Sequence, residues 1–282
     1  MTGKDRVYAR PTTIEDATRA MSAEGALAVS GGTDVYPAHV GRPLARPLVD
    51  LSRVEGLRGI WQTSDGIRLG AATTWTDILR ATLPPAFDGL KAAAREVGSV
   101  QIQNRGTIAG NLCNASPAAD GVPPLLSLEA SVEIAAPAGR RVLPLGQFIT
   151  GYRRTALQPG EIVTAITVPR PAAAARSAFV KLGTRRYLVI SVLMAAAVVE
   201  RDAEGRIARA AVAVGAASPV ARRLALLEAE LVGHAGPPSA LVAAHHLEGL
   251  APIDDLRATA AYRLDAALAA VSEALDRAAG VA

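Results

Sequence analysis

Short apolar runs and alternating apolar and polar residues along the first 170 positions predict a mixture of helices and strands. Helices are predicted over residues 13–21, 74–80 and 90–97, the first of them capped by Thr13 with Asp16 in its first turn. Strands are predicted over residues 26–30, 48–51, 66–71, 132–135 and 161–168. Such a mixture of short elements indicates an α+β fold.

Two prolines and a run of alanines at residues 169–176 interrupt these patterns and predict a domain boundary. Beyond it, strands are predicted over residues 178–181, 194–200 and 210–214, with a hairpin turn at residues 202–205. Apolar stripes predict two helices, one through Leu224, Leu227 and Leu231 with Gly233 as its C-cap, and one through residues 264–275. We expect a first domain over residues 1–170, with subdomains of about 1–55 and 56–170, and a second domain over residues 177–280.

Composition narrows the class of protein. Of the 282 residues, 50% are hydrophobic and 20% are charged, as in an ordinary globular protein. The formal charge of +4 comes from scattered arginines and only 4% of residues are aromatic, so we expect no nucleic-acid binding. The first 13 residues lack an apolar leader, and the longest apolar run, at residues 192–199, is too short to span a membrane. We therefore expect a cytoplasmic protein without a membrane span.

Residues that could carry chemistry by themselves are few. Cys113 is the only cysteine, which excludes an intrachain disulfide and an iron–sulfur cluster held by this chain. A small buried filler is the favoured interpretation of Cys113, and a thiolate near a helix N-terminus is the other. None of the histidines has metal-ligand spacing with a carboxylate, and the pair His245-His246 is expected on a helix surface. Because no catalytic triad, HExxH or CxxC motif is present, we assign no catalytic residue and no metal site.

The first glycine-containing segment, residues 29–34 (VSGGTD), follows a predicted strand directly. Its glycines permit a sharp turn whose successive N–H groups can form a nest for an anion, and Ser30 and Thr33 add hydroxyl groups. A pyrophosphate would suit such a nest. Taken alone, a plain tight turn between strand and helix is the simpler interpretation, since the segment is neither a P-loop nor a GxGxxG fingerprint.

The second segment, residues 104–120 (NRGTIAGNLCNASPAAD), concentrates glycine, asparagine and hydroxyl residues. Ser116-Pro117 predicts a helix start there, and a helix N-terminus beside glycine and asparagine donors would suit a diphosphate. Asp120 could accept a hydrogen bond from a ribose hydroxyl or a ring N–H. The alternative is a capped loop whose asparagines satisfy their own backbone. With no catalytic group of its own, the chain would rely on the reactivity of a redox cofactor or nucleotide.

These segments, together with others in the same order along the chain, resemble the FAD-binding (medium) subunits of molybdenum hydroxylases, the family of xanthine dehydrogenase and carbon monoxide dehydrogenase. Residues 30–34 resemble the first FAD loop of that family, and residues 103–120 resemble its second loop, with Ala109 in place of the usual glycine. The resemblance continues through residues 151–161, 181–191, 214–220 and 260–263.

The resemblance implies a vanillyl-alcohol-oxidase-type (PCMH-type) two-subdomain FAD-binding fold, followed by a C-terminal α+β domain of the CO dehydrogenase flavoprotein type. FAD would lie between the subdomains, with Asp120 at its flavin or ribitol end. The residues that the resemblance assigns to FAD are Ala28, Val29, Ser30, Gly31, Gly32, Thr33, Asp34, Thr107, Gly110, Asn111, Asn114, Ser116, Asp120, Lys181 and Leu182.

The same resemblance implies an oxidoreductase subunit that works with partners. A 2Fe-2S subunit and a large molybdopterin subunit would complete a heterotrimer, or its dimer, and electrons would pass through FAD to NAD or another acceptor. Val189 stands where the family often has an acidic residue, which makes NAD less secure as the acceptor. Two alternatives stay open, a stand-alone flavin reductase or oxidase and a FAD-free nucleotide-binding or assembly protein.

Overall fold

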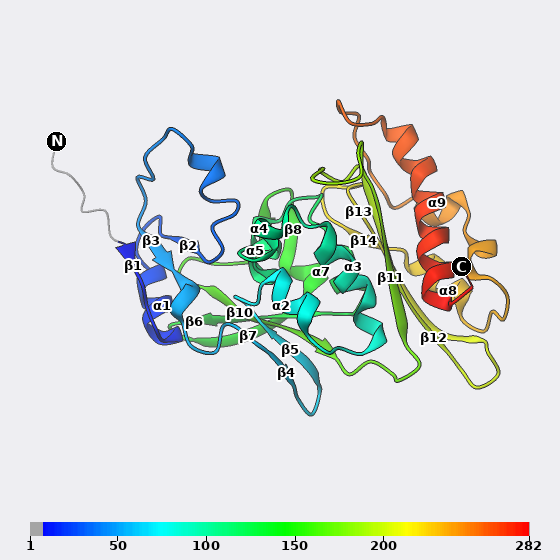
Figure 1. Cartoon of the computed structure of the whole chain (residues 1–282), viewed down its shortest axis with the longest axis horizontal. Coiled ribbons are helices and arrows are strands. Elements are labelled where there is room, and N and C mark those ends of the chain that lie inside the picture. The colour runs from blue at the N-terminus through cyan, green and yellow to red at the C-terminus, as the bar shows by residue number, and fades with distance from the viewer. Residues whose placement is uncertain (1–7, 282) are drawn as a thin grey trace.

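The computed structural model describes residues 8–281, which form three parts that follow one another along the long axis of the molecule (Figure 1). A small sheet with one helix comes first, a larger sheet covered by helices lies in the middle, and a sheet backed by a long helix ends the chain. Residues 1–7, on which part of the expectation of no secretory leader rests, lie outside the described residues.

The first part is a three-stranded parallel sheet in the order β1-β3-β2. Its strands are β1 (Tyr8–Ala9), β2 (Leu27–Val29) and β3 (Leu48–Asp50), accompanied by α1 (Ile14–Met21) and the 3-10 helices η1 (Pro37–His39) and η2 (Leu51–Arg53). As predicted, Thr13 caps α1, because its side chain accepts a hydrogen bond from the N–H of Asp16. The first glycine segment leaves β2 at the carboxyl edge of this sheet, where open parallel sheets commonly place a ligand.

The middle part is built on an antiparallel sheet in the order β4-β5-β10-β6-β7. The strands are β4 (Ile60–Gln62), β5 (Gly66–Gly70), β6 (Ser131–Ala136), β7 (Gly139–Pro144) and β10 (Ile162–Pro169). A large hydrophobic core covers this sheet and includes the fully buried side chains of Trp75, Phe87 and Phe148. The core holds the surrounding helices in fixed positions.

Those helices carry the second glycine segment. They are α2 (Trp75–Arg80), η3 (Pro85–Phe87), α3 (Asp88–Glu96), α4 (Val100–Gln103), α5 (Ile108–Asn114), α6 (Val122–Ser127) and α7 (Leu145–Phe148), and they are followed by the hairpin β8 (Ile149–Gly151) and β9 (Arg154–Thr155). A complete capping box between Thr74 and Asp77 starts α2.

The last part is an antiparallel sheet in the order β11-β12-β13-β14. It contains β11 (Arg176–Leu182), β12 (Leu193–Arg201), β13 (Ile207–Gly215) and β14 (Arg222–Arg223), with α8 (Ala225–Leu231), η4 (Pro238–Leu241), η5 (Ala244–Leu247) and α9 (Ala260–Ala279). Within residues 8–281, none of the helices has the length and apolar character needed to cross a membrane.

The strand β12 joins the middle part to the last part because it is buried on both faces. Leu193, Ala195 and Ala197 belong to the core under α8 and α9. Met194 and Ala196 point the other way and pack with Ala93 of α3. Because alternate residues of β12 are buried on opposite faces, the sequence of this strand is a continuous apolar run. The same packing holds the last part of the chain against α3.

Each helix and strand predicted within residues 8–281 is confirmed to within a few residues, apart from the helix start at Ser116. The sequence patterns did not predict the short elements β4, β7, β8, β9 and β14 or the helices α4 and α5. These elements are too brief, or too rich in glycine and asparagine, to show a clear period.

Candidate cofactor-binding cleft

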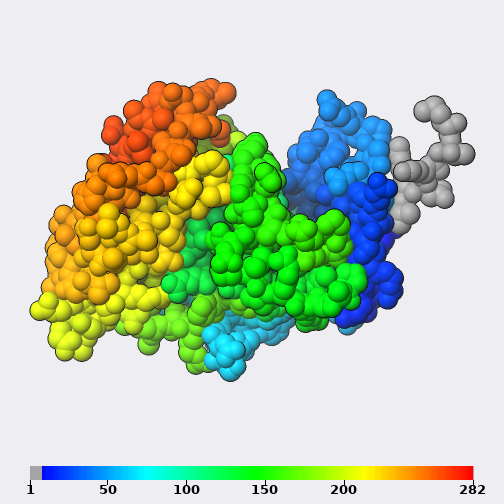
Figure 2. All heavy atoms as spheres, turned by 180° about the vertical axis from the view of Figure 1, so that it is seen from behind, coloured from blue at the N-terminus to red at the C-terminus, as the bar shows by residue number. Residues whose placement is uncertain are grey.

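A cleft of about 640 Å³ lies between the first part of the chain and the middle part. Figure 2 shows the notch on the surface where the N-terminal part, in blue, meets the middle part, in green. The predicted site residues that line this cleft are Ala28, Ser30, Gly31, Gly32, Thr33, Asp34, Thr107, Gly110, Asn111, Asn114, Ser116 and Asp120. Both glycine segments therefore meet in one cavity.

Three predicted site residues do not line the cleft. Val29 is buried in β2, one position beyond the lining residue Ala28. Leu182 packs against the core of the last part of the chain. Lys181 reaches the cleft only indirectly, through its ion pair with Asp120.

The loop after β2 presents unpaired backbone donors. The N–H groups of Gly31, Gly32, Thr33 and Asp34 donate no backbone hydrogen bond to another described residue. A Cβ on Gly31 would lie 2.0 Å from the carbonyl oxygen of Arg105, so this loop rests directly on the second glycine segment. Gly32 has a φ of +72°, which favours glycine. The result is a nest of amide donors of the kind that binds diphosphate oxygens.

The second glycine segment forms a rigid wall of the cleft. Thr107 is the N-cap of its helix α5, and the Thr107 side chain accepts a hydrogen bond from the N–H of Gly110 at 3.2 Å. The N–H groups of Ile108 and Ala109 donate to backbone carbonyls of the loop before α2. Because most of its first-turn amides are already used, α5 offers the cleft fewer free donors than the first loop does.

The prediction that a helix starts at Ser116-Pro117 is wrong. The Ser116 hydroxyl accepts the N–H of Ala118 at 3.3 Å and its carbonyl accepts the N–H of Ala119 at 3.0 Å, which makes a turn. The next helix, α6, begins only at Val122. The helix N-terminus at the cleft therefore belongs to α5, nine positions before the one predicted.

Asn111 carries a polar atom without a partner. Its Oδ1 is buried and makes no hydrogen bond within the described residues, although Asn111 lines the cleft. An unpaired buried polar atom is costly unless a ligand or water satisfies it. Together with the free amides of the first loop, this atom fits a cofactor that bears both phosphate oxygens and hydroxyl groups.

Asn114 ties the two loops together rather than pointing free into the cleft. Its Nδ2 donates to Asp34 Oδ1 at 2.8 Å, and its Oδ1 accepts a hydrogen bond from the Arg153 guanidinium. The backbone N–H of Arg153 in turn donates to the carbonyl of Ala115 at 3.0 Å. Among the described residues that line the cleft, Arg153 is the only cation.

Asp120 lines the cleft as part of a buried polar cluster. Its Oδ2 is 2.6 Å from Lys181 Nζ, and its Oδ1 accepts a hydrogen bond from Ser191 at 2.6 Å. Lys181 also donates to the carbonyl oxygen of Glu96 at 3.3 Å. Burial raises the pKa of the Asp120 carboxyl, while Lys181 and Ser191 act in the opposite direction.

Several residues of the cleft wall were not predicted from the sequence. They are Trp75, Glu96, Val97, Ile102, Arg153, Leu188, Val189 and Ile190, among others. Leu188 and Ile190 are more than half exposed, which is unusual for large apolar side chains. The sequence does contain a signal for this loop, because residues 181–191 carry part of the family resemblance.

Cys113 lies on the cleft wall and is exposed. The favoured interpretation of this residue as a small buried filler is therefore wrong. The thiolate interpretation loses its basis as well, because Cys113 lies near the C-terminal end of α5, where the helix dipole does not stabilise a negative charge.

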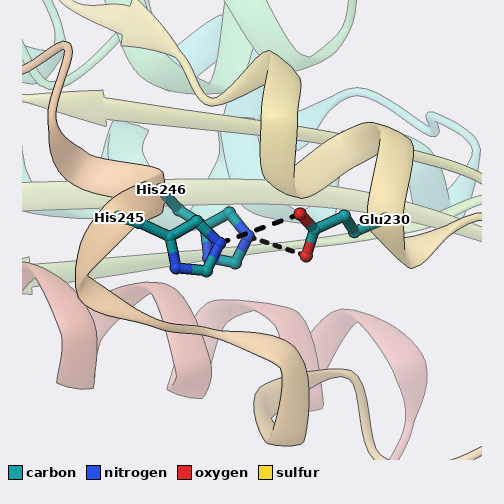
Figure 3. A group of neighbouring side chains, drawn as sticks. All are labelled: Glu230, His245 and His246. Atoms are coloured by element: carbon teal, nitrogen blue, oxygen red, sulfur yellow. Dashed lines mark hydrogen bonds and ion pairs between the residues drawn. The ribbon is translucent and has the colours of Figure 1, made fainter.

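A carboxylate also lies beside the histidine pair, contrary to the expectation from sequence spacing. In Figure 3, Glu230 of α8 faces His245 and His246 of η5, with Nε2 of His246 3.1 Å from its nearer oxygen. His246 is buried rather than on a helix surface. Its Nδ1 accepts the N–H of Ala243 at 3.0 Å, so the ring proton lies on Nε2 and is donated to Glu230. This arrangement anchors η5 to α8 and leaves no free Nε2 lone pair for a metal.

The cleft between the first and middle parts has the size and the polar groups that suit a large diphosphate-bearing cofactor. Residues 3–171 match the family model described as the FAD-binding domain in molybdopterin dehydrogenase, and residues 178–278 match that of the CO dehydrogenase flavoprotein C-terminal domain. The chain belongs to this family of FAD-binding subunits of molybdenum hydroxylases, and its cofactor is FAD.

Individual relatives agree with this assignment. The chain is 34% identical to the putative xanthine dehydrogenase FAD-binding subunit of Escherichia coli (strain K12), over 75% of this chain and 74% of that one. It is 33% identical to the carbon monoxide dehydrogenase medium chain of Afipia carboxidovorans, over 96% of both. A solved carbon monoxide dehydrogenase from Hydrogenophaga pseudoflava matches with a TM-score of 0.88 at 27% identity, covering 100% of this chain and 99% of that one. The predicted fold and the oxidoreductase class are confirmed.

Proposed function

We propose that this chain is the electron-relay subunit of a heterotrimeric molybdopterin-dependent hydroxylase. Electrons pass from 2Fe-2S clusters of a partner subunit to the FAD held in this cleft, and then to NAD or another acceptor. The observation that carries the proposal is a FAD cleft in a chain that aligns with a medium chain over 96% of its length. The presence of a single cysteine supports the proposal, because a 2Fe-2S cluster needs about four protein ligands and must therefore be held by a partner subunit.

Within the cleft, we assign the diphosphate to the amides of residues 31–34, with Thr107, Gly110 and Asn111 on the opposite wall. The free N–H groups of the first loop support this assignment, since oriented amides favour an anion. Asp120 faces the flavin or ribitol end, with Lys181 behind it. The domain division at residues 1–170 and 177–280 is part of the same proposal, and the two family matches support it.

A second pocket of about 410 Å³ supports an anionic acceptor such as NAD. It shares Ser116, Ala118, Arg153 and Ile190 with the FAD cleft, so the two cavities adjoin. Its wall contains Arg153, Arg257 and Arg263 against the single carboxylate of Asp255, an excess of positive charge that suits phosphate groups. Ile190 borders both cavities, and Val189, which stands where the family often has an acid, lines the FAD cleft next to it.

Anaerobic NADH titration of the purified complex tests the relay, because electrons can then enter from the acceptor side. NADH should bleach the flavin absorption and afterwards the 2Fe-2S absorption, whereas the chain alone should show only flavin bleaching. If the flavin bleaches and the clusters of the intact complex stay oxidised, the relay is wrong. If dithionite reduces both centres and NADH reduces neither, the acceptor is not NAD.

A further inference from the structure

Both oxygens of the Asp120 carboxylate are held by residues from the other side of a domain junction. Asp120 lies in the segment that matches the FAD-binding domain, whereas Lys181 and Ser191 lie in the segment that matches the C-terminal domain. Lys181 pairs with Oδ2 and Ser191 donates to Oδ1, each at 2.6 Å. The three side chains therefore form one contact across the junction.

This contact is almost completely shielded from water. Ser191 is 1% exposed and Asp120 is 7% exposed. Asp120 lines the FAD cleft, whereas Ser191 lines the adjoining pocket, so the hydrogen bond between them lies in the wall that separates the two cavities. A buried carboxylate needs such partners, because an unpaired buried charge is strongly disfavoured.

The ion pair with Lys181 alone would not fix the orientation of the Asp120 carboxylate. The ammonium group is a compact charge without directional preference, so it fixes the distance to the carboxylate better than the orientation of the carboxylate plane. The Ser191 hydroxyl makes no other side-chain hydrogen bond among the described residues, and it fixes the second oxygen. Two contacts from different positions define the plane of the carboxylate toward the cleft.

We propose that Ser191 is a positioning residue for FAD, which acts through Asp120 by fixing the orientation and the charge of its carboxylate. The proposal rests on the assignment of Asp120 to the FAD site. Ser191 itself does not line the FAD cleft, and its one side-chain hydrogen bond among the described residues goes to the carboxylate that does.

Because Asp120 can be protonated, the proposal predicts how FAD affinity depends on pH. The titratable groups that face this carboxylate are Lys181 on β11 and Glu96 at the end of α3. Loss of the Ser191 hydroxyl removes one of the interactions that favour the ionised form, so the carboxyl takes up its proton at a higher pH. As the pH falls, a variant without the hydroxyl should lose its FAD affinity earlier than the wild type.

The test compares Ser191→Ala with Ser127→Ala in the full chain after removal of FAD. Ser127 is equally buried and donates to the carbonyl of Pro124, away from the cleft. Flavin fluorescence gives the FAD dissociation constant from neutral to acidic pH. We expect Ser191→Ala to bind FAD about tenfold more weakly, as for a lost hydrogen bond to a charged group. As the pH is lowered, its FAD affinity should also begin to fall at a higher pH than that of the wild type. Ser127→Ala should match the wild type.

A double-mutant cycle shows whether the effect passes through Asp120. In an Asp120→Asn background, Ser191→Ala should weaken FAD binding much less and should lose its pH signature. If Ser191→Ala does not fold, Ser191→Cys keeps a small and weaker donor, for which we expect an intermediate affinity and an intermediate acid shift.

The inference is overturned if Ser191→Ala behaves like Ser127→Ala, if Ser191→Cys matches the wild type in affinity and pH profile, or if Ser191→Ala has its full effect without Asp120. These outcomes are distinct from failure of the proposed function. If Asp120→Asn binds FAD as the wild type does, the assignment of Asp120 fails, and the inference falls with it.

Discussion

Gly31 sets how closely the two glycine segments approach each other. No side chain fits at this position, because a Cβ would lie 2.0 Å from the carbonyl oxygen of Arg105. The amides of residues 31–34 lie beside this contact at the cleft, and they donate no backbone hydrogen bond within residues 8–281. Backbone donors held in this way cost little reorganisation when an anion binds.

Replacing Gly31 by alanine should push the two loops apart. We expect a loss of about 1–3 kcal/mol in the free energy of unfolding, as for other overpacked sites, together with lower FAD occupancy. Denaturant unfolding and the ratio of flavin to protein absorbance measure the two effects. Gly249→Ala is the matched control, because a Cβ there meets nothing within 4 Å. Full FAD occupancy in Gly31→Ala would show that the loop contact does not shape the site.

Asp255 makes stability depend on pH. Partial burial acts to raise the pKa of its carboxyl, but hydrogen bonds from Arg257 and Ala258 and the charge of Arg263 lower it to about 2. Its contribution to stability is therefore complete above its ordinary pKa of 3.8 and is lost as the pH falls towards about 2. Arg263 is buried, so it depends on this partner.

Asp255→Asn should lower the free energy of unfolding by about 1–3 kcal/mol at neutral pH, because the Arg263 guanidinium loses its buried counter-charge. The difference from the wild type should shrink in acid, where wild-type Asp255 is also protonated. Urea unfolding at neutral and acidic pH checks both statements. Asp265→Asn, at an exposed position of α9, provides the comparison. A difference that is constant with pH would contradict the linkage.

The residues of the first loop could be predicted because glycines and hydroxyl residues directly after a strand are a local signal. The contacts of Asp120 could not be predicted in this way. Its partners Lys181 and Ser191 are 61 and 71 positions away in the sequence, and folding alone brings them together. The pairing of Glu230 with the histidines escaped prediction for the same reason.

At the scale of elements, α5 decides the shape of the cleft wall. The sequence indicated a helix start at Ser116, because a serine followed by proline is a common N-terminal signal. Here the chain forms a turn at that point, since α5 already ends at Asn114 with Ala115 in a left-handed conformation. Local propensity identified the correct segment but misplaced the helix within it.

Thr107 caps α5 in the way that Thr13 caps α1, with 3.2 and 3.1 Å between the hydroxyl and the N–H. Thr107→Ala and Thr13→Ala should each cost about 0.5–2 kcal/mol of stability, as lost N-caps do. Only Thr107→Ala should also weaken FAD binding, because Thr107 lines the cleft. Thermal unfolding and FAD titration of both variants check this. Equal FAD affinity in the two variants would remove Thr107 from the binding site.

At the scale of the whole molecule, the last part of the chain contributes to the wall of the cleft. The two-sided burial of β12 seats the last sheet on α3, and the loop between β11 and β12 lines the cleft with residues 188–190. The order of elements could be predicted from hydrophobic patterns, but this packing between parts could not, because no local pattern encodes it. One assembled unit thus offers the cleft that we assign to FAD and an adjoining cationic pocket.

The central claim is that this chain holds FAD as one subunit of a molybdenum hydroxylase. The most direct test is a visible absorption spectrum of the chain purified with its partners from the native host, combined with gel electrophoresis and metal analysis. We predict flavin bands together with two further subunits, iron and molybdenum. If the chain carries flavin but no other subunits, iron or molybdenum are purified with it, the assembly is contradicted. If the chain stays colourless after incubation with FAD, the whole claim is contradicted.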